Sequence, residues 1–176
     1  LLSRRQRHMC IRDSNISMPQ DLPNIPRIGL QFEIEKELQN IDWYGRGPHE
    51  NYIDRESGAA ISTYQTTLDQ WITPYVRPQE NSNRGGIRWL RFSQGTHQLQ
   101  FSAVEDPFCA SAWPYTTNTL EQTTHDFDLK MHNNIIVNID CNQMGVGGDC
   151  SWGLPVLQKY QIKPGKYQYK FKISAK

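Results

Sequence analysis

Apolar and polar positions alternate along much of this chain from Pro26 onward, and this period predicts a protein built from β-strands. In the first such segment, residues 28–35, four large apolar side chains, Leu30 among them, alternate strictly with small or polar ones. Because successive side chains of a strand point to opposite faces, a period of two is typical of a strand buried on one side. Shorter segments of the same kind lie at residues 41–43, 99–103, 135–139 and 167–173.

One short helix is predicted over Thr119–His125, where a threonine or asparagine near the start can cap the first turn. The rest of the pattern consists of many strands and short turns, with abundant tyrosine, tryptophan and threonine, which favour strands. These features predict an all-β fold, and specifically an antiparallel β-sandwich.

The composition narrows the class of protein. The chain has 176 residues, enough for one domain, but with 37% hydrophobic residues and a mean hydropathy of −0.70 its core must come from patterning. No apolar run approaches the roughly 20 residues of a membrane helix, so we expect no membrane partner. The net charge of +1 argues against a nucleic-acid partner.

Cysteine and histidine spacing gives no sign of a metal site. The four cysteines include no Cys-x-x-Cys pair, and the five histidines include no His-x-x-x-His pair. We therefore predict neither a metal site nor a cofactor on this chain. Cys141 and Cys150 could meet, but free buried thiols are the simpler interpretation, and the cellular compartment is left open.

Residues 1–14 differ from the rest of the chain. They carry four arginines, show neither a strand nor a helix period, and lack the apolar segment of a signal peptide. One interpretation is a basic tail for an acidic partner. We favour the other, a non-native scar or a disordered tail, and therefore expect the domain to lie within residues 15–176.

The most informative stretch for function is the run Met144–Trp152, which we call the glycine loop. Three glycines in four positions let its backbone turn tightly and approach a neighbour closely. Asp149 and Ser151 follow these glycines and precede Trp152. An exposed indole on a rigid loop suits the apolar face of a sugar ring, because it is broad and has few torsions to freeze. The alternative is that Trp152 is a buried core or interface residue.

Two polar segments each mix arginine, glutamate and asparagine after a strand, and we call them the first polar cluster (Tyr44–Arg55) and the second polar cluster (Tyr75–Arg84). Such groups could bind sugar hydroxyls through planar, bidentate hydrogen bonds. Alternatively, they bond one another and the backbone and so hold long loops in place, which is the interpretation we favour. The candidate side chains are Arg46, Glu50, Asn51, Glu80 and Asn81.

Catalytic signatures within the chain are weak. A glycosidase needs two carboxylates about 5–5.5 Å apart for retention or roughly 6.5–9.5 Å apart for inversion, and nothing in the sequence sets two of them face to face. An epimerase of the mutarotase kind needs an acid–base pair, for which His49 with Glu50 or Glu80 is the available choice. No Gly-x-Ser-x-Gly nucleophile motif is present, and the glycine loop does not open a helix as a phosphate loop would.

The two polar clusters and the glycine loop together resemble the C-terminal domain, also called the small chain or domain 5, of family 2 β-galactosidases. The motifs that carry this resemblance are Tyr44–Tyr52 with Asp54 and Arg55, then Tyr75–Asn81, then Met144–Trp152. They occur in the expected order, and the match covers about residues 21–174. Several independent motifs would have to coincide for this likeness to be accidental.

This resemblance implies a galactose-mutarotase-like β-supersandwich that closes a larger hydrolase, which removes terminal non-reducing β-D-galactose with retention. It implies that the catalytic glutamates lie on a TIM barrel outside this chain, so the chain has no catalytic residue and is inactive alone. It also implies that Trp152 is the main substrate platform, with Asp149 and Ser151 beside it, whereas Cys150 departs from the acidic residue often found there. The chain would then begin partway through its domain, which makes the supersandwich N-terminally truncated.

The same resemblance implies the partners. These are the β-galactoside substrate, the remaining domains of the hydrolase and, in some members, further copies of the protein; Mg and Na ions bind other domains of the parent. Three alternatives stay open: a free-standing carbohydrate-binding module, which would bind sugar by itself; an aldose-1-epimerase-like enzyme, which would bring a histidine and a carboxylate together in a pocket; and a structural or oligomer-forming domain with Trp152 buried between subunits.

Overall fold

A computed structural model describes residues 9–147 and 153–176 of the chain. Strands dominate this part, and its helices are short. The elements, in chain order, are β1 (Met9–Ser17), β2 (Arg27–Glu35), β3 (Asn40–Gly47), β4 (Ala60–Thr67), α1 (Leu68–Trp71), β5 (Arg84–Ile87), β6 (Trp89–Gln94), β7 (His97–Ala103), β8 (Phe108–Trp113), α2 (Thr117–Gln122), η1 (Asp126–Asp128), β9 (Asn134–Gln143), η2 (Gln158–Tyr160) and β10 (Lys166–Ala175).

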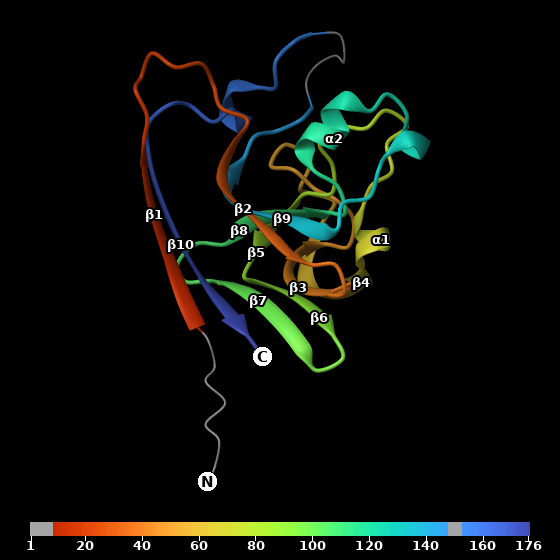
Figure 1. Cartoon of the computed structure of the whole chain (residues 1–176). Coiled ribbons are helices and arrows are strands. Elements are labelled where there is room, and N and C mark those ends of the chain that lie inside the picture. The colour runs from red at the N-terminus through yellow and green to blue at the C-terminus, as the bar shows by residue number, and fades with distance from the viewer. Residues whose placement is uncertain (1–8, 148–152) are drawn as a thin grey trace.

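The strands form two sheets whose neighbouring strands are antiparallel. One sheet has six strands in the order β1-β10-β7-β6-β3-β4, and the other has four in the order β2-β9-β8-β5 (Figure 1). This arrangement confirms the predicted all-β sandwich. Within the described residues, none of the helices is long and apolar enough to span a membrane.

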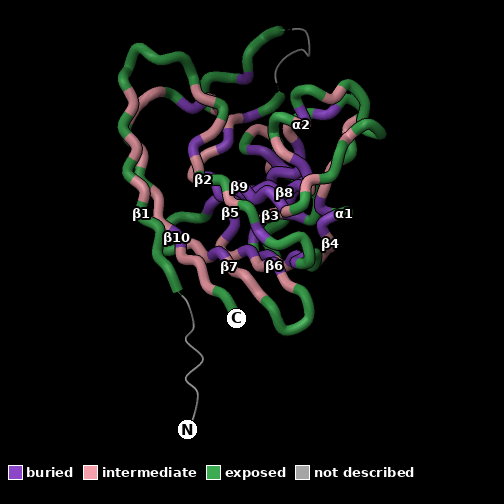
Figure 2. Tube along the Cα trace, viewed as in Figure 1, coloured by how far each residue is buried: buried purple, intermediate pink, exposed green. Residues whose placement is uncertain are grey.

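The core lies between the sheets and is rich in aromatic side chains. Trp43 of β3 and Trp71 of α1 meet edge to face, with ring centroids 4.9 Å apart and planes at 81°. Phe101 of β7 and Phe171 of β10 lie 6.3 Å apart in the same cluster. These side chains are almost completely buried, and Figure 2 shows buried positions gathered where the sheets face each other. Burying such large rings contributes much of the stabilisation of a small sandwich.

The structure confirms strands at all five segments that show the period of two, in β2, β3, β7, β9 and β10. The predicted helix is present as α2, which begins two residues earlier, and the Thr116 side chain caps it by accepting a hydrogen bond from the Thr119 N–H at 3.1 Å. The prediction that Leu30 is on the buried side is wrong, because this residue is 37% exposed. Leu30 lies opposite the buried Ile139 of β9 and on the same face as Ile34, but β2 is the edge strand of its sheet, where neighbouring strands cover a side chain from one side only.

Residues 9–14 form most of β1, although they show no apolar period. This strand pairs with β10 along its whole length, from Met9 opposite Ser174 to Ser17 opposite Lys166. The pairing depends on backbone hydrogen bonds at a sheet edge, which need no apolar alternation, and Met9 remains 60% exposed. The period of two therefore does not reveal this strand. That residues 1–14 are non-native stays a prediction.

Candidate functional site

The structure brings the two polar clusters into direct contact. The first cluster begins within β3 and the second ends at the start of β5, and their backbones pair where Asn51 N donates to Asn83 O at 2.8 Å. Asn83 Nδ2 returns a bond to Asn51 O at 2.7 Å, and Gly85 N donates to Asn51 Oδ1 at 2.9 Å. Asn51 is fully buried. This residue thus ties together two loops that are more than 30 residues apart in the chain.

Glu50 is the charged member of this contact. It is only 8% exposed, and its carboxylate accepts hydrogen bonds from Arg55, from the Tyr75 hydroxyl and from Ser82 N, the last at 2.6 Å. Burial by itself would raise the pKa of Glu50, but the bonds from Tyr75 and Ser82 outweigh it and lower the pKa. Glu50 is therefore an ionised carboxylate whose acceptor positions are taken up within the protein.

Arg84, at the start of β5, completes the contact, and the sequence does not single it out as a candidate. Its guanidinium lies 4.1 Å from the ring centroid of Trp71 and donates to the carbonyls of Trp71 and Ser82, each at 2.8 Å, and of Pro48 at 3.2 Å. Burial lowers its pKa to about 10. The available signal in the sequence is an arginine next to two glycines, which does not indicate burial.

We call Glu50, Asn51, Asn83 and Arg84 the cluster junction.

Glu80 belongs to a separate ion-pair group. Both of its carboxylate oxygens lie 3.0 Å from Arg27 Nη2, and Arg27 Nε lies 3.2 Å from Asp140 Oδ2. The Nε–H is aligned on Gln143 Oε1 at 3.1 Å, so Asp140 is near the charge of Arg27 without an aligned hydrogen bond. Burial raises the pKa of Asp140 to about 7, with Arg27 opposing this and Glu80 adding to it. Two carboxylates therefore share one guanidinium.

The remaining candidates from the two clusters also bond within the protein. Arg46 Nε pairs with Glu56 Oε2 at 2.9 Å, and its Nη1 donates to the carbonyl of Ala59 at 3.1 Å. Asn81 Nδ2 donates to Gln79 O at 2.9 Å, and Asn81 Oδ1 accepts from a neighbouring hydroxyl. All five cluster candidates thus have protein partners that hold the loops together.

Trp152, Asp149, Cys150 and Ser151 lie outside the described residues, but the start of the glycine loop is described. Gly147 N donates to Asp54 Oδ2 at 2.6 Å, and Gly145 N donates to the carbonyl of Tyr160 at 3.0 Å. The structure therefore brings the glycine loop against Asp54 of the first polar cluster.

Gly145 is required there because of space. A Cβ at this position would lie 2.7 Å from Asp54 Cγ and 2.8 Å from Val156 Cγ2, closer than such atoms approach one another. The expectation from the sequence is that these glycines allow either a tight turn or a close approach. At Gly145 the close approach is the reason.

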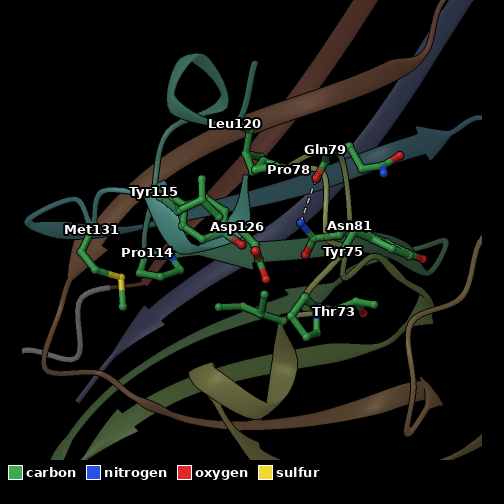
Figure 3. Close-up of a pocket in the computed structure, with 13 residues that line it drawn as sticks. Thr73, Tyr75, Pro78, Gln79, Asn81, Pro114, Tyr115, Leu120, Asp126 and Met131 are labelled. Carbon is green, nitrogen blue, oxygen red and sulfur yellow. Dashed lines mark hydrogen bonds between the residues drawn. The ribbon is translucent and has the colours of Figure 1, made fainter. Parts of the chain in front are cut away.

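A cavity of about 260 Å³ lies beside the second cluster, with Tyr75, Asn81 and Tyr115 among its lining residues (Figure 3). Figure 3 shows the Asn81 side chain bonded to Gln79. Of the residues that line this cavity, Asp126 is the sole carboxylate and none is a histidine. The cavity therefore lacks the pair of carboxylates that glycoside hydrolysis requires. Among the described residues, no group of three histidine, cysteine, aspartate or glutamate side chains is placed to hold a metal ion.

The fold and the site together define a β-sandwich domain. Its two antiparallel sheets carry polar loops that bond each other, and the start of the glycine loop is held against one of them. The profile of the family described as beta galactosidase small chain matches residues 5–173. The chain is 38% identical to a β-galactosidase of Halalkalibacterium halodurans over 81% of its length, 37% to one of Vibrio cholerae over 89%, and 35% to one of Streptococcus thermophilus over 86%. It spans 14–15% of the length of these relatives.

The chain belongs to the β-galactosidase small-chain family. The resemblance that its motifs carry is thereby confirmed.

Proposed function

We propose that this chain is the carbohydrate-contacting C-terminal domain of a retaining β-galactosidase, which hydrolyses terminal non-reducing β-D-galactose residues. The similar proteins are β-galactosidases of which the chain spans 14–15%, so most of such a protein lies beyond it. The proposal assigns the catalytic glutamates to that remaining part, and the chain alone is inactive. Metal ions and further copies of the protein belong to the complete enzyme and stay predictions.

The main support for this proposal, beyond the family, is the contrast between the polar clusters and the glycine loop. The cluster candidates Glu50, Asn51 and Glu80 are each engaged by protein partners, as a scaffold requires. The loop that leads to Trp152 starts from a backbone fixed on Asp54. A loop anchored at its base can present an aromatic platform at little cost in conformational entropy.

Such a platform acts through binding and not through bond breaking. The indole would contact the aglycone half of the β-galactoside and hold the scissile bond in position for groups carried elsewhere in the enzyme. Binding of this kind stabilises the bound substrate and the transition state together, and so it acts chiefly on KM.

The epimerase alternative gains no support from the geometry. His49 is exposed, Glu50 is engaged by Arg55 and Tyr75, and Glu80 is paired with Arg27. Neither glutamate has the unpaired carboxylate that an acid–base partner for His49 would need.

The test is Trp152→Ala in the complete β-galactosidase, with Trp152→Phe as the matched variant that keeps an aromatic face. We expect Trp152→Ala to raise KM about tenfold, which corresponds to about 1.4 kcal/mol. We expect kcat and the thermal midpoint to change little, and Trp152→Phe to retain most of the affinity. An unchanged KM together with a large fall in thermal midpoint would overturn the platform role, as would β-galactoside cleavage by the purified chain alone.

A further inference from the structure

We propose that Asp54 is a positioning residue that sets the start of the glycine loop and thereby the affinity for the aglycone. This inference rests on the proposed function, because it needs Trp152 to contact substrate. Its support is a set of contacts between Asp54, Gly145, Gly147 and Val156, all of which are described. Asp54 itself touches no substrate and acts through the loop.

A hydrogen bond joins Asp54 directly to the glycine loop. Gly147 N donates to Asp54 Oδ2 at 2.6 Å, although the two residues are 93 positions apart in the chain. A bond from an N–H to a charged carboxylate is short and about twice as strong as a neutral one. This bond orients the peptide plane of Gly147 immediately before the segment that leads to Trp152.

The loop backbone also fits closely around the carboxyl group of Asp54. A Cβ added at Gly145 would lie 2.7 Å from Asp54 Cγ, and one added at Gly147 would lie 3.0 Å from Asp54 Oδ2. The carboxyl group thus lies against two alternate glycines, and neither tolerates a side chain without some movement. Asp54 is therefore in close contact with the backbone in addition to hydrogen bonding it.

The chain that leaves the glycine loop packs on the chain that enters it. A Cβ at Gly145 would come within 2.8 Å of Val156 Cγ2, which lies beyond the loop. Gln161 Nε2 in turn donates to Val156 O at 2.6 Å. Asp54, Gly145 and Val156 therefore form a common base for both ends of the loop.

Anchored neighbours hold Asp54 in place. The next residue, Arg55, is ion-paired with Glu50, and its guanidinium lies 4.9 Å from the ring centroid of Tyr52. Tyr52 is 2% exposed. Asp54 lies between these two residues in the chain, so the contacts of Tyr52 and Arg55 hold its backbone in place. Asp54 in turn holds Gly147 of the loop. The geometry thereby links the buried scaffold to the proposed substrate platform.

The experiment measures kcat and KM of the complete β-galactosidase for β-galactosides with a large apolar aglycone and with a small one. The variants are Asp54→Ala, Asp54→Asn, Trp152→Ala and the double variant Asp54→Ala with Trp152→Ala. Asp42→Ala is the matched control, because one carboxylate oxygen of Asp42 likewise accepts hydrogen bonds, from Arg91 at 3.1 and 3.2 Å, but Asp42 lies within β3.

We expect Asp54→Ala to raise KM for the large-aglycone substrate about five- to tenfold, with kcat within about twofold, because uniform binding is lost. Asp54→Asn keeps an oxygen acceptor for the Gly147 N–H and is expected to stay within about twofold of the wild type. Asp42→Ala should leave both constants unchanged. The double variant should have the KM of Trp152→Ala alone, since residues that act through one another are not additive.

The outcomes separate the two proposals. If Trp152→Ala raises KM and Asp54→Ala does not, the role of Asp54 is overturned while the platform role stands. If neither raises KM, both are overturned. Additive effects in the double variant, or equal effects on both substrates, would also overturn the positioning role. Should Asp54→Ala fail to fold, Gly145→Ala replaces it. Its Cβ would lie 2.7 Å from Asp54 Cγ and 2.8 Å from Val156 Cγ2, so the loop must move relative to Asp54 and the same rise in KM is expected. An unchanged KM would contradict the proposal.

Discussion

The cluster junction and the described start of the glycine loop are both held by residues of the first polar cluster, but many hydrogen bonds hold the junction and few hold the loop. At the junction, Asn51 and Arg84 are buried and bond several backbone groups each. At the described start of the loop, Gly147 N donates one hydrogen bond to Asp54. Gly145 N donates one to the carbonyl of Tyr160, and Gly145 also packs on Val156, which follows the loop.

Residue type therefore does not distinguish scaffold from site. Arginine, glutamate and asparagine side chains that could bind sugar hydroxyls are engaged inside the protein at the junction, where each buried polar group needs a partner. The described start of the loop depends on fewer bonds, so it can be altered with less effect on the fold. Changes at the junction should therefore act on stability, and changes at the loop should act on affinity.

The largest effect is expected at Arg84. Arg84→Met keeps much of the side-chain volume over Trp71 but leaves three carbonyls without their donor. The carbonyls of Trp71 and Ser82 belong to buried residues, whereas Pro48 is exposed and its carbonyl can bond water instead. Each unsatisfied buried group costs about 1–3 kcal/mol, so the loss should be roughly 2 kcal/mol or more. Hydrogen exchange of the β5 amides in the complete protein should become correspondingly faster.

The control for Arg84 is Arg91→Met. Arg91 pairs with Asp42, and its side chain is 33% exposed, so its loss should cost less than about 1 kcal/mol. Equal exchange rates in the two variants would contradict the role given to the cluster junction.

A second effect, which is of comparable size and depends on pH, is expected at Asp140. Its pKa of about 7 in the folded protein lies above the value of about 3.9 for an unfolded chain, so the folded state holds the proton to higher pH. The free energy of unfolding therefore falls as pH rises from about 4 through 7, by an amount on the order of 2–4 kcal/mol.

Asp140→Asn is neutral at every pH and should remove this dependence. The measurement is hydrogen exchange of the β9 amides in the wild type and the variant at matched pH values between 5 and 8. The variant should be better protected at pH 8, with the difference shrinking toward pH 5. A constant difference between the two proteins across this range would show that Asp140 does not titrate there.

The period of two predicts β2, β3, β7, β9 and β10, and three of the strands that it misses have little difference between their two faces. β8 (Phe108–Trp113) is largely buried on both sides and contains small residues, so no alternation marks it. β5 has four residues, two of them glycine, and β1 pairs through its backbone with its side chains largely exposed. A period of two reports a difference between two faces, and these strands have little such difference. β6 is missed for another reason, because its buried Leu90 and Phe92 do alternate with less buried residues but the segment is short.

For the candidate site, the sequence locates the motifs but not their contacts. Glu50 and Tyr75 are 25 positions apart, and Asp54 and Gly147 are 93 apart, so only the folded chain shows that each pair meets. Burial of Arg84 and Asp140 likewise depends on how distant segments pack. The roles of Trp152, Asp149 and Ser151 stay predictions, because these residues lie outside the described part of the chain.

The separation of scaffold from substrate platform can be tested with Glu50→Gln and Trp152→Ala in one complete β-galactosidase, by measuring thermal midpoint and KM for both. We expect opposite results: Glu50→Gln lowers the midpoint by several degrees and leaves KM unchanged, while Trp152→Ala raises KM about tenfold and leaves the midpoint nearly unchanged. The reverse pattern, with Trp152→Ala destabilising the protein at constant KM, would contradict this separation.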